Sequence, residues 1–226
     1  MDILNKEFNR YIKDCVPKMK DQEVYYVDKS NKDTLMQMQK LEEYDNFFYD
    51  LFYNSKIKDL AANALGEDVL PRAMEYFNKP PGKSKPTPPH QDGFYFNLDN
   101  DKAVTGWLAL EDVDDENGCI HYVKGSHSKE EYRPHGKSEI LGFSQGVTDF
   151  GTEEDKINTV KFEGKAGMFL MHHAKTIHFA SSNKSPVRSR RAFGFVYHGV
   201  SAKHNIEKEK VDQKKLHDEL KEKRII

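Results

Sequence analysis

The sequence predicts a single domain with an all-β core, a sandwich or barrel of short strands, preceded by a mainly helical N-terminal part. From residue 71 onward, short apolar segments alternate with Gly, Asn and Asp, which is typical of such folds. Residues 1–70 instead carry apolar side chains at helical spacing. A length of 226 residues suits one domain with a sizeable core, and an aromatic share of 12% argues against disorder.

The N-terminal part, residues 1–70, is expected to be mostly helical. The stretch "DTLMQMQKLEEYDNFFYDLF" places apolar side chains along one wide helical face, at Leu35, Met38, Leu41, Tyr44, Phe48, Leu51 and Phe52. The stretch "SKIKDLAANALG" continues the pattern, with Gly66 as the expected C-terminal stop. We expect this apolar face to pack against the core.

The strand-rich core is expected over residues 71–200. "RAMEYFNK" reads as a strand and "PPGKSKPTPP" as a loop, and further short strands follow in "HQDGFYFNL", "VTGWLALEDV", "GCIHYV", "TVKFE", "GMFLMHH" and "RAFGFVYHGV". The long irregular insert 126–158 is expected to be lid-like, because connections of that length are usually functional lids or disordered. The charged tail 201–226 predicts a solvated helix.

Composition limits the possible partners and compartment. A net charge of −2 provides no basic footprint for nucleic acid. The two cysteines, Cys15 and Cys119, form no CxxC pair, which suits a reducing compartment. The N-terminus is charged where a signal peptide needs an apolar run, and no segment approaches the ~20 apolar residues of a membrane span. We therefore expect a cytoplasmic protein without membrane partners.

Three short motifs lack the surrounding sequence that their usual function requires. Two GKS triplets, Gly82–Ser84 and Gly136–Ser138, lack the earlier glycine of a phosphate loop. "GFSQG" matches a nucleophile elbow around Ser144. The polar stretches on both sides do not provide the buried strand and helix that an elbow requires. Ser144 is therefore not predicted to be a nucleophile.

The stretch "PPHQDGFYFN" carries the strongest chemical signal. On a strand, His90 and Asp92 would project from the same face, roughly 7 Å apart, and could grip one ion. A second histidine would complete a two-histidine, one-carboxylate group, which leaves one face of an octahedral iron open. We therefore predict a metal site.

The distal ligand has three candidates in "GMFLMHHAKTIHFASSN": His172, His173 and His178. An aromatic-rich strand is expected to end near His173, and His178 opens the next strand, where its side chain would face back into the barrel. We favour His178 and interpret His172 as a core histidine or a support for the ligands. The remaining candidates flank loops, where solvent exposure or substrate contact is expected: His121, His127 and His135.

The chain resembles the phytanoyl-CoA dioxygenase family of iron(II)- and 2-oxoglutarate-dependent oxygenases. The resemblance is carried by "PPHQDGFYF", "GWLALEDVDDENGCIHYVKGSH" and "HHAKTIHFASSNKSPVRSRRAFG", in family order. It implies a double-stranded β-helix, or jelly roll, with N-terminal helices packed outside. It also implies that His90, Asp92 and His178 are the iron ligands. The intact Asp92 makes halogenation unexpected, since halogenases of the family lack that carboxylate.

The resemblance also implies where 2-oxoglutarate binds. An arginine is expected to hold its distal carboxylate, because guanidinium binds carboxylate bidentately. "RSRRAF" offers Arg188, Arg190 and Arg191, and Arg190 matches best, one residue further from the distal histidine than expected. Arg190 and Arg191 face opposite sides of a strand, so only one can enter the barrel. Trp107 matches a tryptophan beside the cosubstrate, although a core role is also consistent with it.

Two residues after the distal histidine, the family often has a serine that contacts the cosubstrate, and this chain has Ala180 there. The adjacent Ser181 would face the opposite side of the strand, so it is not expected to substitute.

The expected activity is hydroxylation of an unactivated C–H bond of a small organic substrate with O₂, releasing succinate and CO₂. Two alternatives remain: another cupin-type metalloenzyme, such as an isomerase or ring-cleaving dioxygenase, and a non-catalytic jelly-roll binding protein. The substrate and the oligomeric state cannot be read from the sequence. Basic residues near the predicted mouth hint at an anionic substrate: Lys83, Lys85, Arg133 and Arg188.

Overall fold

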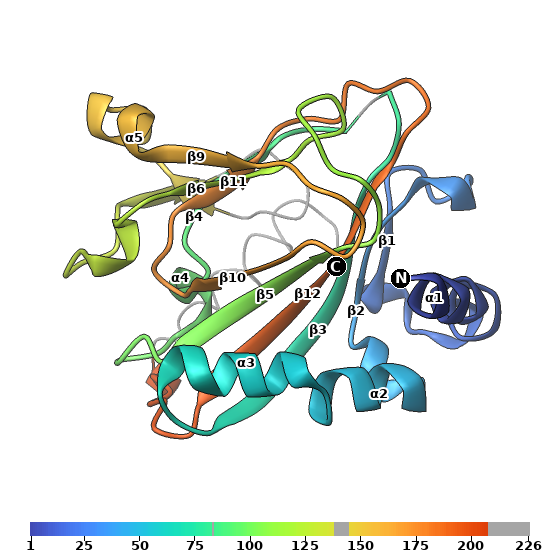
Figure 1. The fold of residues 1–226 in the computed structure, drawn as a ribbon, viewed down its shortest axis with the longest axis horizontal. Helices are drawn as coiled ribbons and strands as arrows, with labels where there is room; N and C mark the ends of the chain where they lie inside the picture. Colours follow the sequence, from blue (N-terminus) through green and yellow to red (C-terminus); the bar gives the residue numbers. More distant parts are fainter. Residues whose placement is uncertain (83, 138–144, 208–226) are drawn as a thin grey trace.

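Two antiparallel sheets face each other in the computed structural model, which describes residues 1–82, 84–137 and 145–207 (Figure 1). The larger sheet has the order β1-β2-β3-β12-β5-β10 and the smaller the order β4-β11-β6-β9. The strands of the larger sheet are β1 (Val24–Tyr26), β2 (Leu35–Gln39), β3 (Val69–Lys79), β5 (Ala103–Ala109), β10 (Phe169–His173) and β12 (Arg190–Gly199). Those of the smaller sheet are β4 (Thr87–His90), β6 (Ile120–Val123), β9 (Thr159–Phe162) and β11 (His178–Ala180).

The larger sheet buries both of its faces, and each face has a different role. On β12, Phe193, Phe195 and Tyr197 join the core formed with the N-terminal helices. Strand alternation turns Arg190 and Ala192 to the opposite face, toward the smaller sheet. The outer face is therefore a packing surface, and the inner face is available for a site.

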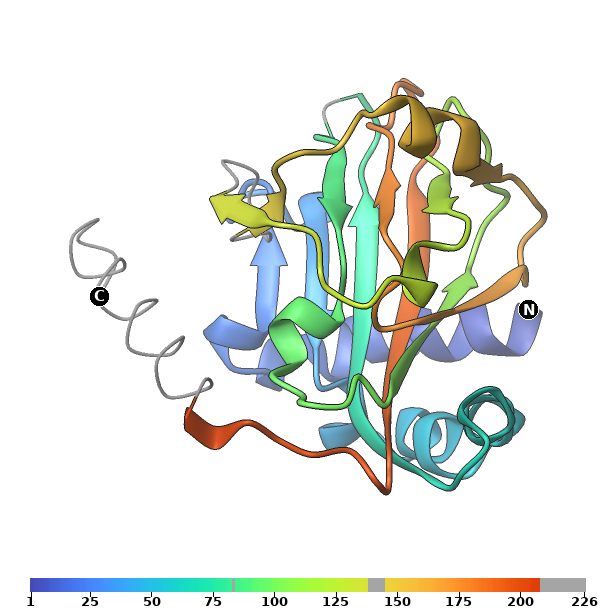
Figure 2. The same cartoon turned by 90° about the vertical axis from the view of Figure 1, so that its left-hand side faces the viewer.

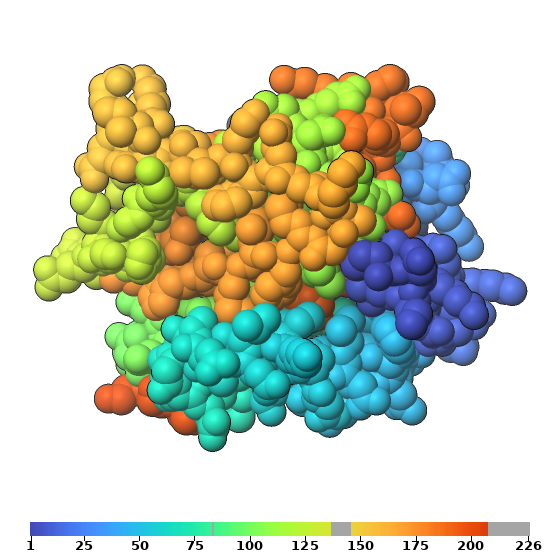
Figure 3. Space-filling model, viewed as in Figure 1, coloured from blue at the N-terminus to red at the C-terminus, as the bar shows by residue number. Residues whose placement is uncertain are grey.

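Three helices cover the outer face: α1 (Asp2–Asp14), α2 (Asn46–Tyr53) and α3 (Lys56–Leu65). Figure 2 shows α1 running across the strands, and Figure 3 shows the helices together on one side of the molecule. The side chains of Asp45 and Ser55 cap α2 and α3 by accepting hydrogen bonds from backbone N–H groups. Gly66 ends α3 in the left-handed conformation at φ 70°, as the sequence predicts.

The mainly helical interpretation of residues 1–70 is wrong for Leu35–Gln39, which form strand β2, and β1 pairs with it. β2 pairs in turn with β3, with Met38 opposite Tyr76. Met38 joins the helix-side core, whereas Gln37 and Gln39 alternate to the inner face. Pairing with an otherwise open strand of the large sheet overrides the local helical spacing, because it satisfies a row of backbone hydrogen-bonding groups.

The insert expected as a lid, 126–158, contains regular structure in its described part. It includes η5 (Ser126–Ser128), the paired strands β7 (His135–Lys137) and β8 (Gln145–Val147), and α5 (Glu153–Asn158). Short 3₁₀ turns elsewhere are η1 (Val16–Lys18), η2 (Asp21–Glu23), η3 (Lys32–Thr34) and η4 (Leu41–Glu43), and α4 spans Gly93–Phe96. Ser144, Lys83 and the charged tail beyond residue 207 lie outside the described residues.

Across the described ranges, no helix combines the length and the apolar character that crossing a membrane would require. Cys15 and Cys119 are both buried free thiols.

Candidate metal centre

Pairing between β4 and β11 brings two histidines side by side. His90 is the last residue of β4 and His178 the first of β11, and the two are register partners. Their ring centroids lie 4.1 Å apart, and both residues are buried. The expectation that His178 opens a strand facing into the barrel is therefore met.

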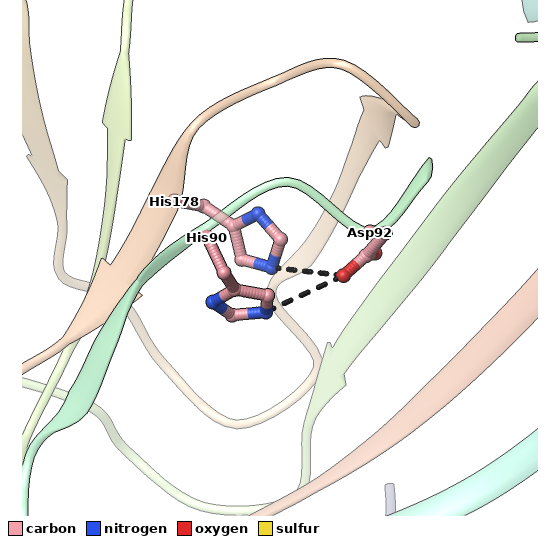
Figure 4. A group of neighbouring side chains, drawn as sticks. All are labelled: His90, Asp92 and His178. Atoms are coloured by element: carbon pink, nitrogen blue, oxygen red, sulfur yellow. Dashed lines mark ion pairs between the residues drawn. The ribbon is translucent and has the colours of Figure 1, made fainter. Parts of the chain in front are cut away.

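Asp92 reaches the same point by a turn and not along a strand. The expectation that it shares a strand face with His90 is wrong, because β4 ends at His90 and Asp92 adopts helical backbone angles (φ −56°, ψ −39°) before α4. The turn brings Asp92 Oδ1 to 3.4 Å from His90 Nε2 and 3.5 Å from His178 Nε2. Figure 4 shows the carboxylate facing both imidazoles.

The two imidazoles are oriented by their other nitrogen. His90 Nδ1 donates to the carbonyl of Pro88 (2.8 Å), and His178 Nδ1 donates to that of Thr176 (3.0 Å). This fixes the tautomers with the Nε2 lone pairs toward Asp92. Ligand atoms about 2.1 Å from one ion lie about 3.0–3.4 Å apart, close to the observed separations. The three residues can thus hold a single metal ion.

His172 supports the carboxylate and does not belong to the group around the ion position. Asp92 Oδ2 accepts hydrogen bonds from Thr105 Oγ1 (2.6 Å) and from His172 Nε2 (3.0 Å). The Tyr122 hydroxyl in turn donates to His172 Nδ1 (2.8 Å). Oδ2 is thereby fixed, and Oδ1 is left toward the two ligand histidines. The sequence interpretation of His172 as a supporting residue agrees with this geometry.

His173, the third candidate, is turned the other way. It follows His172 on β10, so its side chain leaves the sheet on the opposite face. Its ring lies 6.2 Å from that of His127, and its Nδ1 accepts a hydrogen bond from the backbone N–H of Lys175.

The electrostatics keep the group in its metal-binding form. Burial alone would raise the pKa of Asp92, but the neighbouring His178 and the hydrogen bond from His172 hold it well below its usual range. Burial, followed by the proximity of His90 and His172, lowers the pKa of His178 well below its usual range. At neutral pH the carboxylate is ionised and His178 is neutral, which is what a metal ion requires of its ligands.

Arg190 lies on the inner face and forms no ion pair with an acidic side chain of the described residues. It is 5% exposed, and its Nε has no hydrogen-bond partner among the described residues. Its guanidinium lies 5.5 Å from the ring centroid of Trp107. Burial lowers the pKa of Arg190 to about 10, so it remains a cation at neutral pH. Arg191, in contrast, pairs with Glu111 at 2.9 Å.

Lys79 was not singled out by the sequence. It is the register partner of Arg190 on β3, and its Nζ donates to the carbonyl of Lys85 (2.7 Å). Burial, followed by the charge of Arg190, lowers the pKa of Lys79 to about 6. Its position beside Arg190 follows from the strand register alone, because the register brings the C-terminal end of β3 next to the start of β12.

The basic residues expected at the mouth are largely compensated. Arg133 pairs with Asp149 and Asp155, and Arg188 pairs with Asp114 and Glu116. Neither guanidinium therefore offers an uncompensated charge to an anionic substrate.

The other sequence candidates are not among the three residues around the ion position, although His135 Nε2 accepts a hydrogen bond from the backbone N–H of Gln91 (3.4 Å), between His90 and Asp92. His135 stacks on Phe94, and His121 stacks on Phe179. Asp115, Cys119 and His121 form a second group with metal-ligand spacing, but Lys161 already pairs with the exposed Asp115. Burial, aided by the hydrogen bond to Asp115, raises the pKa of the Cys119 thiol to about 12, which disfavours the thiolate that a metal needs.

Fold and site together define a jelly-roll protein with a two-histidine, one-carboxylate group between its sheets. The model of the phytanoyl-CoA dioxygenase family matches residues 1–192, and the chain belongs to that family. It is 27% identical over 176 residues to a probable alpha-ketoglutarate-dependent hypophosphite dioxygenase of Stutzerimonas stutzeri, covering 75% of this chain and 60% of that protein. It is 31% identical over 157 residues to phytanoyl-CoA dioxygenase of Arabidopsis thaliana, covering 68% and 53%.

Solved structures support the fold. EctD from S. alaskensis in its apoform superposes with a TM-score of 0.71 at 17% identity, covering 90% of this chain and 70% of EctD. The non-heme alpha ketoglutarate dependent carbocyclase SnoK from nogalamycin biosynthesis gives a TM-score of 0.64 at 21% identity, covering 88% and 77%. The expected jelly roll with helices outside is confirmed.

Proposed function

We propose that the protein is an iron(II)- and 2-oxoglutarate-dependent dioxygenase that hydroxylates an unactivated C–H bond of a small organic substrate, releasing succinate and CO₂. The observation that carries the proposal is the convergence of His90, Asp92 and His178. On the inner face of the facing sheet lies the cation of Arg190, which forms no ion pair within the described part of the chain.

The residues fit iron. Two neutral imidazoles and one carboxylate bind a divalent ion from one side and leave the opposite positions open. When bound, iron supplies the oxygen activation and redox chemistry. The role of the chain is to hold the carboxylate still, through Thr105 and His172, and to exclude water by enclosing the site between two sheets.

The residues also fit 2-oxoglutarate. A buried guanidinium without an acidic partner is costly, and a carboxylate that forms two parallel hydrogen bonds with it relieves that cost. Arg190 and Trp107 lie on the same face of the large sheet as Thr105, which binds Asp92. A keto acid could therefore extend from the ion past Trp107 to Arg190.

The names of the relatives favour the same chemistry. The curated relatives are named as dioxygenases, one of them alpha-ketoglutarate-dependent, whereas the similar structures include a carbocyclase and an epimerase.

A panel of candidate substrates tests the proposal under labelled dioxygen. We expect one substrate class to stimulate succinate release and to gain a single labelled oxygen atom, and Asp92→Ala to abolish both effects. Stimulated succinate release without label in the organic product would contradict hydroxylation. Substrate conversion that needs no 2-oxoglutarate would contradict the whole assignment.

A further inference from the structure

The inner face of the large sheet carries a second acidic residue, Glu75 on β3. Its neighbours Met74 and Tyr76 belong to the helix-side core, so alternation turns Glu75 toward the smaller sheet. Glu75 is the register partner of Gly194, which is itself paired with Trp107. Glu75 therefore lies two strand spacings, about 10 Å, from the strand of Trp107, on the same face.

Glu75 has no counter-charge in the part of the chain that the structure describes. Its hydrogen-bond partners are neutral amides: Gln37 Nε2 donates to Oε1 at a long 3.4 Å, and Gln39 contributes a second contact. Among the charged groups that shift its pKa, the carboxylate of Asp92 has the largest effect. Burial, followed by the charge of Asp92, raises the pKa of Glu75 to about 7.

The side chains around Glu75 on the inner face are two amides and one aromatic ring. Gln39 is its register partner on β2, and Gly194 is its partner on β12. Gly194 provides no side chain, and a Cβ there would meet the Phe77 ring at 2.8 Å. The arrangement is one carboxylate and two amides on the inner face, beside the Phe77 ring, which covers Gly194.

An anion is an unsuitable occupant beside this group. 2-Oxoglutarate and Asp92 are both anionic, and a further carboxylate would be repelled by Glu75. A cationic nitrogen would lower the pKa of Glu75, keep it ionised and provide the missing counter-charge, while the amide oxygens of Gln37 and Gln39 accept its remaining hydrogens.

We propose that Glu75, supported by Gln37 and Gln39, recognises the substrate, and that the substrate carries a protonated amine. This inference rests on the proposed function, since it assigns these side chains to the substrate side of the same site. It replaces the anionic substrate suggested by the sequence, whose two arginines, Arg133 and Arg188, are already paired with acids.

Trp107 is the sole tryptophan of the chain, so its fluorescence reports occupancy of the inner face. The full chain is titrated with butyl, hexyl and octyl probes, each as the ammonium, the N-alkylacetamide and the carboxylate. Titrations are run with and without iron(II) and 2-oxoglutarate under anaerobic conditions. We expect the best ammonium probe to bind about 10-fold or more tightly than its matched acetamide and carboxylate.

Glu75→Gln removes the charge with little change of shape and should abolish the ammonium preference. Glu43→Gln makes the same charge change at an exposed position on η4 and should keep it. Equal or tighter binding of the matched acetamide or carboxylate, no ammonium binding, or an unchanged preference in Glu75→Gln would each overturn the inference.

If Glu75→Gln does not fold, the comparison of matched probes on the wild-type chain still tests whether an ammonium group is preferred. A failure of iron and 2-oxoglutarate to bind would count against the proposed function, whereas the metal-free titrations test the amine preference separately.

Discussion

Arg190 and Arg191 are adjacent, yet strand alternation gives them opposite surroundings. Arg190 is buried on the inner face near Trp107, and Arg191 pairs with Glu111. Removing one partner of a buried, hydrogen-bonded charge pair costs roughly 2–5 kcal/mol. We therefore expect Arg190→Ala to raise the apparent constant for 2-oxoglutarate about 30-fold or more, with little change in metal affinity.

Arg191→Ala is the matched control for this prediction and should leave the 2-oxoglutarate constant close to that of the wild type. Both variants are titrated with 2-oxoglutarate under anaerobic conditions. A large loss in Arg191→Ala with a near-normal Arg190→Ala would show that the wrong arginine has been assigned to the cosubstrate.

At the scale of elements, docking of α1 onto the sheet depends on one aromatic cluster. Phe8 is fully buried, and its ring lies 4.6 Å from that of Tyr76 and 5.1 Å from that of Phe193. Truncation of a buried Phe costs about 3–5 kcal/mol, through lost transfer free energy and a cavity. We expect Phe8→Ala to lower the free energy of unfolding by that amount.

Ile3 lies on the same helix but is 73% exposed, so Ile3→Ala should change the unfolding free energy by less than about 0.5 kcal/mol. Denaturant unfolding measures both variants. Equal effects of the two substitutions would mean that α1 is not anchored as described.

The sequence predicts the elements unevenly, for physical reasons. α3 and its end at Gly66 follow from local signals, because caps and helical spacing act within a few residues. β2 was missed, because Leu35–Gln39 becomes a strand only by pairing with β3, far along the chain.

The candidate site, too, is only partly predictable from the sequence. The proximity of His90, Asp92 and His178 follows from their motifs and the family resemblance, and their role as iron ligands stays a prediction. The turn at Asp92, the support by Thr105 and Tyr122, and the positions of Glu75 and Lys79 depend on sheet register. No single stretch of sequence encodes that register.

At the scale of the whole molecule, folding buries ionisable side chains that are exposed to solvent in the unfolded chain. His198 is buried, its ring lies 5.1 Å from that of Phe96, and neither ring nitrogen has a hydrogen-bond partner among the described residues. Burial, followed by the charges of Arg72 and His204, lowers the pKa of His198 to about 4. The unfolded chain binds this proton below about pH 6.5, so His198 makes stability fall as the pH drops from about 6.5 to 4.

The contribution of His198 over that range is at most about 3.4 kcal/mol. Burial raises the pKa of Glu42 to about 7, so Glu42 makes stability rise as the pH drops. The effect of His198 is therefore measured as the difference in unfolding free energy between the variant and the wild type. We expect His198→Leu to flatten the fall in unfolding free energy between pH 6.5 and pH 4, measured by urea unfolding at stepped pH. An identical pH dependence in variant and wild type would exclude this role.

The central claim is that His90, Asp92 and His178 hold an iron to which 2-oxoglutarate binds, and anaerobic titration tests it most directly. Wild-type chain should take up one equivalent of iron(II) and develop a visible metal-to-ligand charge-transfer band when 2-oxoglutarate is added. Asp92→Ala and His178→Ala should lose the iron, whereas His172→Ala should keep it. Iron-loaded chain that shows no band with 2-oxoglutarate, or loss of iron in His172→Ala but not in His178→Ala, would contradict the account.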